Sequence, residues 1–191
     1  SATDTKQPTA FLQYSHTIGI AAMEGRGFYY PRDTAIGNDG RLYVASRSTD
    51  NAIRGVRVTM CNLDSEFLGV FGSFGSDPGQ FTTPAGLAAD SAGRVYLSDE
   101  SVHRISVFGP DGDFLSMFGD RGSGPAQFDW PSGMAFDAAD NLYISDTQNN
   151  RVQMFTAEGR HVLSFGSKGS EDGQFHLPWG LSVAPGGDIY V

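Results

Sequence analysis

Hydrophobic and polar residues alternate in short blocks along the chain, as expected for strands separated by tight turns. The apolar run 134–136 is followed by the polar segment 137–141, where Asp and Asn favour a turn by bonding their own backbone. The runs 142–145, 151–155 and 161–165 follow, each separated from the next by another polar turn. Short strands at regular spacing predict an all-β fold, and no stretch of the chain shows sustained helical periodicity.

A unit of 47 residues recurs along the chain. The pattern Gln-Phe-x-x-Pro-x-Gly occurs at 80–86, 127–133 and 174–180, so the three prolines are 47 residues apart. A looser copy, Phe-Tyr-Tyr-Pro at 28–31, precedes the first of these by 53 residues. The same three intervals separate four tyrosines: Tyr43, Tyr96, Tyr143 and Tyr190. A period of this length is typical of solenoids, propellers and other repeat arrays.

Four strands per unit match one blade of a β-propeller, which has roughly 40 to 50 residues. Because blades stack face to face around a channel, their strands are covered on both faces. Runs such as 95–97 and 105–108 are continuously apolar, as doubly covered strands require. We therefore predict that residues 1–191 form a single all-β domain, a β-propeller of four-stranded blades.

The segment 142–155, Leu-Tyr-Ile-Ser-Asp-Thr-Gln-Asn-Asn-Arg-Val-Gln-Met-Phe, resembles the signature of NHL repeats. The Gly-Gln-Phe…Pro-x-Gly start of each unit also resembles these repeats, and the similarity covers about residues 14–191. It is weaker in the first repeat, where Ser46 replaces the turn Asp and six extra residues lie near 50–55. The resemblance implies a propeller, most often six-bladed, and it implies no single activity.

The phase of the repeat predicts the limits of each blade. We expect about three and a half blades and a closing strand at residues 14–18, which are in phase with the fourth strands of later repeats and would complete the last blade. Residues 1–10 are polar and are expected to form a disordered tail. The expected blades are 28–72, 81–119, 128–166 and a partial one at 175–191.

The C-terminal end of the sequence stops within a repeat. Val191 aligns with Ile144, in the middle of a second strand. Six blades need about 280 residues at this repeat length, so we expect the chain to be a C-terminally incomplete fragment. A half blade on its own would leave strand edges unpaired.

Composition narrows the range of partners. The chain has 13 Lys plus Arg against 22 Asp plus Glu, a net charge of −9, without a basic run. Nucleic-acid binders need a positive surface, so we predict no nucleic-acid partner, although some NHL proteins bind RNA. Anionic membrane surfaces are disfavoured likewise, and no segment is apolar enough to insert.

The single cysteine and the start of the sequence bear on the compartment. Cys61 has no second cysteine to pair with, and we expect it to be a buried, inert thiol. No signal peptide or initiator Met is present. A mature secreted or periplasmic protein is slightly favoured over a cytoplasmic one, and the compartment stays open.

We predict no metal site, cofactor or catalytic residue in this sequence. Ligands around a channel should share one phase of the repeat, and the four histidines do not. Some propellers related to NHL proteins, such as peptide-amidating lyases, hold zinc with histidines in the channel. For that family the resemblance implies a Pro-His-Ser triplet at the start of a blade. Here the triplets are Pro-Ala-Gly, Pro-Ser-Gly and Pro-Trp-Gly. Gly-x-Ser-x-Gly is absent, and the glycine-rich segments 72–76 and 166–170 recur as linkers between blades.

One set of recurring polar residues is interpreted as structural. Asp99 and Asp146 end second strands and precede Arg104 and Arg151 by five residues, and Asn149 lies in the turn. A carboxylate ring for calcium or acid–base chemistry is the alternative. Recurrence in each well-formed repeat favours a structural network of charge-assisted hydrogen bonds, because a catalytic residue is needed once.

Non-repeating residues in the loops that lead into the first strands are the candidate binding residues. These loops should open on one face of the propeller, which we call the front face. Aromatic and Arg side chains on loops of a rigid scaffold are typical binding anchors. The alternative for the two Trp residues is packing against neighbouring blades. The candidates are Tyr29, Tyr30, Arg32, Asp129, Trp130, His176 and Trp179.

The sequence therefore favours a non-enzymatic scaffold that binds a protein, peptide or glycan through its front face. The alternative is a propeller hydrolase or lyase whose reactive residues lie partly in the absent blades. A third possibility is an extracellular sensor domain attached to a further region. Function resides in sites rather than in folds, so the repeat alone does not decide among the three.

Overall fold

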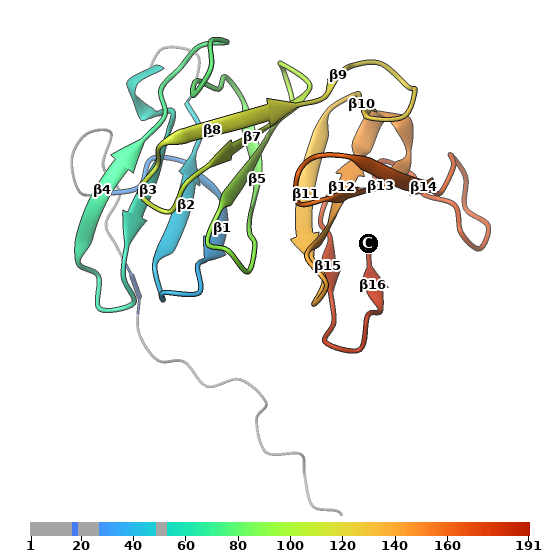
Figure 1. Cartoon of the computed structure of the whole chain (residues 1–191). Coiled ribbons are helices and arrows are strands. Elements are labelled where there is room, and N and C mark those ends of the chain that lie inside the picture. The colour runs from blue at the N-terminus through green and yellow to red at the C-terminus, as the bar shows by residue number, and fades with distance from the viewer. Residues whose placement is uncertain (1–16, 19–26, 49–52) are drawn as a thin grey trace, which may run out of the picture.

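The computed structural model describes residues 17–18, 27–48 and 53–191, and its regular structure there is nearly all β (Figure 1). Three four-stranded antiparallel sheets follow one another along the chain, each with its strands in sequence order. The first is β1 (Pro31–Ile36), β2 (Leu42–Ser46), β3 (Arg57–Cys61) and β4 (Phe67–Phe71). The second is β5 (Pro84–Ala89), β6 (Val95–Asp99), β7 (Arg104–Phe108) and β8 (Phe114–Phe118). The third is β11 (Pro131–Phe136), β12 (Asn141–Asp146), β13 (Arg151–Thr156) and β14 (His161–Phe165).

The remaining elements are short. The pair β9 (Asp120–Arg121) and β10 (Gln127–Phe128) is parallel and links the second sheet to the third. The hairpin β15 (Ser182–Val183) and β16 (Ile189–Tyr190) belongs to the fourth repeat. Two 3-10 turns, η1 (Ile53–Gly55) and η2 (Thr147–Asn149), are the helical segments of the described ranges. None of the described helical segments is long and apolar enough to cross a membrane.

The first strands of successive repeats lie side by side. β1 contacts β5, β5 contacts β11, and β11 contacts β15 (Figure 1). The fourth strands β4, β8 and β14 have mostly exposed or half-buried residues. The sheets are therefore arranged as propeller blades, with first strands inside and fourth strands outside, as the repeat predicted.

The hydrophobic core lies between facing sheets. One cluster joins the first two sheets and includes the fully buried Tyr43, Phe81 and Phe108. A second cluster joins the second and third sheets around Phe128 and Phe155. Each interface thus buries aromatic rings, which remove large apolar areas from water.

A repeated glycine explains how these rings reach the interface. Gly72, Gly119 and Gly166 follow the fourth strands and have φ of +73°, +95° and +92°. A Cβ at Gly72 would lie 2.1 Å from the ring of Phe81, and one at Gly119 would lie 2.6 Å from the ring of Phe128. Only glycine satisfies both the left-handed backbone and the close ring.

The first two of the repeated tyrosines each bond to the following sheet. The hydroxyl of Tyr43 donates to the carbonyl of Pro110 at 2.9 Å, and that of Tyr96 donates to the carbonyl of Ala157 at 2.7 Å. Pro110 and Ala157 are 47 residues apart, at the same turn of successive repeats. For Tyr43 and Tyr96 the period in the sequence therefore reflects a bond between neighbouring sheets, whereas Tyr143 donates to Asp137 of its own repeat.

Some sequence predictions fall outside the described residues. The tail 1–10 and residues 14–16 of the expected closing strand are among them, and Thr17 and Ile18 are not in a strand. The closing strand and the number of blades therefore stay predictions. Cys61 is buried at the end of β3, and burial raises the pKa of its thiol.

Candidate binding site

The front face is held together by the ends of the second strands. In the third repeat Asp146 accepts the backbone N–H of Asp129 at 2.8 Å, and in the second repeat Asp99 accepts that of Thr83 at 3.1 Å. In the first repeat the hydroxyl of Ser46 accepts the N–H of Tyr29 at 3.4 Å. Each leading loop is thus fixed by a side chain from the β-strand beside it.

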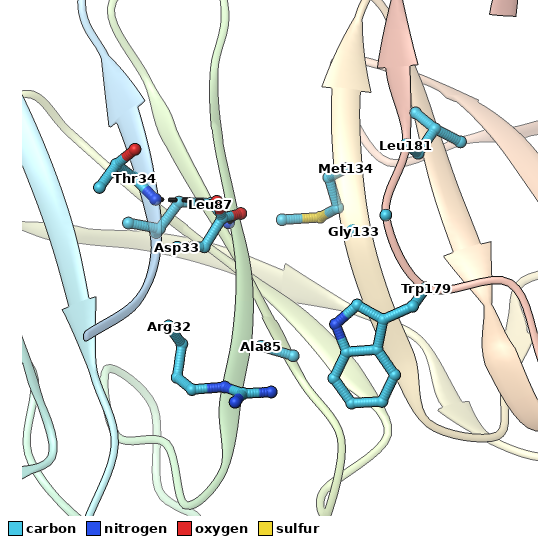
Figure 2. Close-up of a pocket in the computed structure, with 10 residues that line it drawn as sticks. Arg32, Asp33, Thr34, Ala85, Leu87, Gly133, Met134, Trp179 and Leu181 are labelled. Carbon is cyan, nitrogen blue, oxygen red and sulfur yellow. Dashed lines mark hydrogen bonds between the residues drawn. The ribbon is translucent and has the colours of Figure 1, made fainter. Parts of the chain in front are cut away.

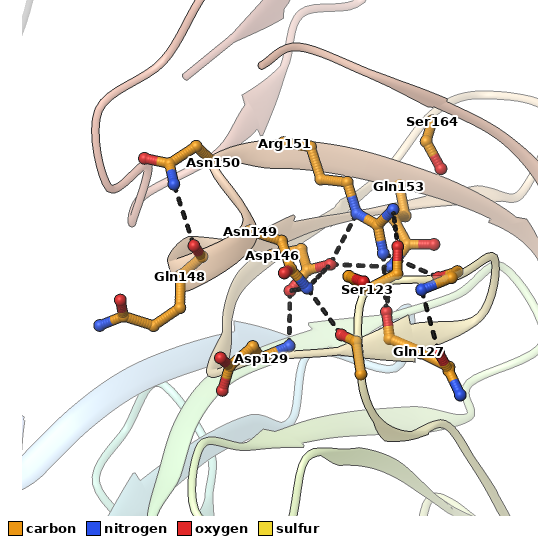
Figure 3. Close-up of polar contacts among 12 residues, drawn as sticks. Ser123, Gln127, Asp129, Asp146, Gln148, Asn149, Asn150, Arg151, Gln153 and Ser164 are labelled. Carbon is orange, nitrogen blue, oxygen red and sulfur yellow. Dashed lines mark hydrogen bonds and ion pairs between the residues drawn. The ribbon is translucent and has the colours of Figure 1, made fainter. Parts of the chain in front are cut away.

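Asp146 is the centre of a buried polar network (Figure 3). Its carboxylate also accepts from Asn149 Nδ2 at 2.9 Å, from Arg151 Nε at 2.8 Å and from Gln153 Nε2 at 3.0 Å. Arg151 donates further to the carbonyls of three residues in the linker that precedes the repeat. Those carbonyls belong to Ser123, Gly124 and Gln127. The network joins the linker to the turn after β12, which is a structural task.

The corresponding residues of the second repeat are arranged differently. Arg104 donates to the carbonyls of Asp77 and Gln80 at 3.2 and 3.1 Å, and it does not pair with Asp99. The oxygens of Asp99 are taken by four backbone N–H groups. These come from Thr82, Thr83, Ser101 and Val102. The expected Asp–Arg pair therefore forms in the third repeat only, because in the second repeat the turn itself satisfies the carboxylate.

The residue before the proline of the repeat is unusual in three of the four repeats. Tyr30, Trp130 and Leu177 have φ of +44°, +60° and +53°, a left-handed conformation that large side chains rarely adopt. Their side chains are 57%, 44% and 44% exposed. In the second repeat the smaller Thr83 stands at this position without a positive φ. Three large apolar groups are thus presented to solvent from strained backbone positions.

Hydrogen bonds from neighbouring repeats hold this conformation. Leu177 N–H donates to Asn150 Oδ1 at 3.0 Å, and Trp130 N–H donates to His103 Nδ1 at 3.4 Å. His103 and Asn150 occupy the same position of successive repeats, and both have positive φ. His103 Nδ1 also lies 3.5 Å from Asp129 Oδ1. The exposed side chains therefore project from a backbone that is fixed.

A cavity of about 290 Å³ lies where the first strands meet (Figure 2). Arg32 reaches across it from β1 toward Trp179 of the fourth repeat, with its guanidinium carbon 5.6 Å from the ring centre. The lining residues are Arg32, Asp33, Thr34, Ala85, Leu87, Gly133, Met134, Trp179, Gly180 and Leu181. The cavity combines one cation, one carboxylate and an indole, and its accessible lining is mostly polar.

Asp33 occupies the position at which the other repeats have glycine. A Cβ on Gly86 would lie 2.4 Å from the carbonyl oxygen of Ser132, and one on Gly133 would lie 2.4 Å from that of Trp179. In the first repeat, the Asp33 carboxylate instead accepts the N–H groups of Leu87 and Thr34, each at 2.8 Å. Burial raises the pKa of Asp33 and outweighs these bonds, which lower it.

The structure places the predicted binding residues as follows. Arg32 and Trp179 meet at the cavity, and Tyr29 and Tyr30 pack edge to face with ring centres 4.9 Å apart. Asp129 and Trp130 lie beside His103, and His176 is exposed.

Three residues of this region were not predicted: Asp33, His103 and Leu177. Asp33 was visible as a departure from Pro-x-Gly. His103 was weighed only as a metal ligand, and Leu177 had no signal because its left-handed backbone cannot be read from a single leucine. Among the described residues, no group of three or more His, Cys, Asp and Glu is arranged to hold a metal ion.

A family model of the NHL repeat matches residues 81–108 and 128–155, which are the first three strands of the second and third sheets and the loops before them. No curated protein matches the chain. The sequence resemblance to NHL repeats is thereby confirmed for these two repeats.

Solved structures with the same fold have varied names. Hydrazine synthase of Kuenenia stuttgartiensis has a TM-score of 0.61 at 15% identity and covers 93% of this chain and 43% of its own. A streptogramin B lyase has a TM-score of 0.60 at 11% identity and covers 85% of this chain and 47% of its own. The WD40 repeats of RRP9 have a TM-score of 0.55 at 17% identity and cover 71% of this chain and 38% of their own. This chain spans less than half the length of these structures, and the likeness shows the propeller fold alone.

Proposed function

Because the chain carries NHL repeats in a β-propeller fold, we propose that it is a binding platform for a protein or peptide, which docks on the front face. The observation that carries this proposal is the exposure of Tyr30, Trp130 and Leu177 from left-handed backbone positions. A backbone outlier of this kind costs about 1–3 kcal/mol and persists where the surroundings enforce it.

The repeat itself does not require these side chains. Thr83 fills the same position of the second repeat with a small polar group, so a large apolar residue is not a condition for forming a blade. Contact of these side chains with the core does not explain them either, because each is more than two-fifths exposed. Their presentation to solvent is accounted for by a partner that covers them.

The residue types fit a protein partner. Trp, Tyr and Arg dominate the energetics of protein interfaces, and the front face exposes Tyr30, Arg32, Trp130 and Trp179. The rigid backbone reduces the entropy lost when a partner is bound. The alternative of a hydrolase or lyase rests on likeness of fold to a lyase, and no residue cluster in the described ranges favours it.

The test is a binding measurement with front-face variants. Proteins captured by the chain are purified and titrated against the wild type, Trp130→Ala and Trp179→Ala. We expect each variant to weaken binding by tenfold or more, as hot-spot truncations do, while urea unfolding stays within about 1 kcal/mol of the wild type. Leu115→Ala on the outer strand β8, an exposed apolar residue away from the front face, is the matched control.

Two results would contradict the proposal. The first is a purified partner that binds Trp130→Ala and Trp179→Ala as tightly as the wild type. The second is loss of folding in these variants, which would assign both indoles to the core. Binding of a glycan array in place of protein, lost in the same variants, would keep the face and replace the class of partner.

A further inference from the structure

Arg32 has a different environment from two arginines that pair with carboxylates at the ends of strands. Arg94 pairs with Asp90, and Arg151 pairs with Asp146. Arg32 is exposed at the mouth of the cavity, and its contact is with the indole of Trp179. Among the described residues Arg32 makes no ion pair, although Asp33 lines the same cavity. In a chain with a net charge of −9, this guanidinium is available to an anion from outside.

Trp179 holds the guanidinium without using its donors. The guanidinium carbon lies 5.6 Å from the ring centre, within the range of a cation–π interaction. Such contact engages the face of the group and leaves the N–H groups at its edge free to bond. A planar fork of donors matches the two oxygens of a carboxylate.

The rest of the cavity limits what can be attached to that carboxylate. Leu87 and Met134 behind the wall are almost fully buried, so the accessible lining is mostly polar, and the volume of about 290 Å³ admits the end of a chain rather than a folded surface. Asp33 lies beside the wall with both oxygens already accepting backbone N–H groups. Its charge disfavours a ligand with a second negative charge, such as a phosphate dianion or an acidic peptide.

We propose that this cavity binds the C-terminal carboxylate of a peptide. The carboxylate pairs with Arg32, and the preceding residues run over the front face. The proposal rests on the platform function above and specifies which part of the partner enters the cavity.

The experiment uses the intrinsic fluorescence of Trp179. Trp130→Phe leaves Trp179 as the single indole of the chain, since the sequence has two. This protein is titrated with N-acetyl-leucine and, separately, with N-acetyl-leucinamide, which differ by the charge of the terminus. We expect a saturable change with the acid and at least tenfold weaker binding of the amide, because a charge-assisted hydrogen bond is lost.

Variants assign the effect to Arg32. In the same background, Arg32→Gln should weaken binding of N-acetyl-leucine about tenfold. Arg160→Gln, in the exposed turn between β13 and β14, removes an equal charge far from the cavity and should leave binding unchanged. Equal binding of acid and amide, no saturable change with either probe, or equal loss in both variants would overturn the proposal.

These outcomes are distinguishable from failure of the platform function. A partner that depends on Trp130 but binds equally as a C-terminal acid and as a C-terminal amide leaves the platform intact and removes the carboxylate site. If the protein binds N-acetyl-leucine selectively but its protein partner binds equally well without Trp130, the carboxylate site stands and the platform function fails.

Discussion

The boundary between the first two sheets differs from the boundary between the third sheet and the fourth repeat. At the latter, Gly133 donates its N–H directly to the carbonyl of Trp179 at 2.9 Å, and there is no room for a side chain at Gly133. At the former, the carboxylate of Asp33 intervenes and accepts the N–H of Leu87. Where the repeat is followed, backbone packs on backbone. Where it is not, the charged side chain of Asp33 lies between the two strands.

The second-strand ends show the same contrast. Asp146 accepts from one backbone N–H, two side-chain amides and one guanidinium in the third repeat, whereas Ser46 accepts one N–H at the same position of the first repeat. Repeated residues therefore maintain the blades, and the departures from the repeat, in the first repeat above all, supply the chemistry of the front face.

The largest expected effect distinguishes the two strand ends. Asp146→Ala leaves the largely buried Arg151 without its counter-charge, which should lower the free energy of unfolding by about 3–5 kcal/mol. Ser46→Ala removes one hydrogen bond and should cost about 1 kcal/mol. Urea unfolding measures both. An equal loss of unfolding free energy in the two variants would show that the network around Asp146 adds no stability beyond the single hydrogen bond to the loop.

The next effect concerns the glycine of the repeat. Gly133→Ala would place a Cβ 2.4 Å from the carbonyl oxygen of Trp179, and forcing backbone apart should cost about 1–3 kcal/mol. Gly180→Ala is the matched control, because a Cβ there meets nothing within 4 Å, and its cost should stay within about 0.5 kcal/mol. A tolerated Gly133→Ala would mean that the sheets can separate at this boundary at little cost.

The smallest effect is in the pH dependence of stability, where two aspartates should act with opposite sign. The pKa of Asp33 is raised by burial, so its contribution is present below the ordinary value of about 3.9 and is lost as pH rises through the folded-state value. Burial also raises the pKa of Asp137, but hydrogen bonds from Asn141 and Ala139 outweigh it and lower the pKa overall. Its contribution is present above about 3.9 and is lost as pH falls through the folded-state value.

The corresponding measurement compares the wild type with Asp33→Asn and with Asp137→Asn in chemical unfolding across the acid range. As pH falls, the stability of the wild type relative to Asp33→Asn should rise, and its stability relative to Asp137→Asn should fall. Parallel trends in the two comparisons would contradict the opposite environments of these carboxylates.

The fold was accessible from the sequence because its signals are local and repeated. The prolines, tyrosines and linker glycines each mark one contact that recurs every 47 residues, so the sheets and their order followed from the period. The closing strand remains a prediction, since residues 14–16 lie outside the described ranges.

The site was accessible only in part. Arg32, Trp130 and Trp179 were identified because they break the repeat, but their contacts depend on how sheets far apart in the sequence face each other. Asp33 gains its meaning from a strand 54 residues away, whose N–H it accepts. The exposure of Leu177 depends on its positive φ angle. Neither property is encoded in the residue type alone.

The central claim is that residues outside the repeat form the binding face. The most direct test is amide hydrogen exchange of the chain with and without a purified partner. The account predicts added protection in the segments 27–34, 128–132 and 175–181, which include the starts of β1 and β11, with little change in the outer strands β4, β8 and β14. Protection confined to those outer strands, which expose Leu68, Leu115 and Val162, would contradict it.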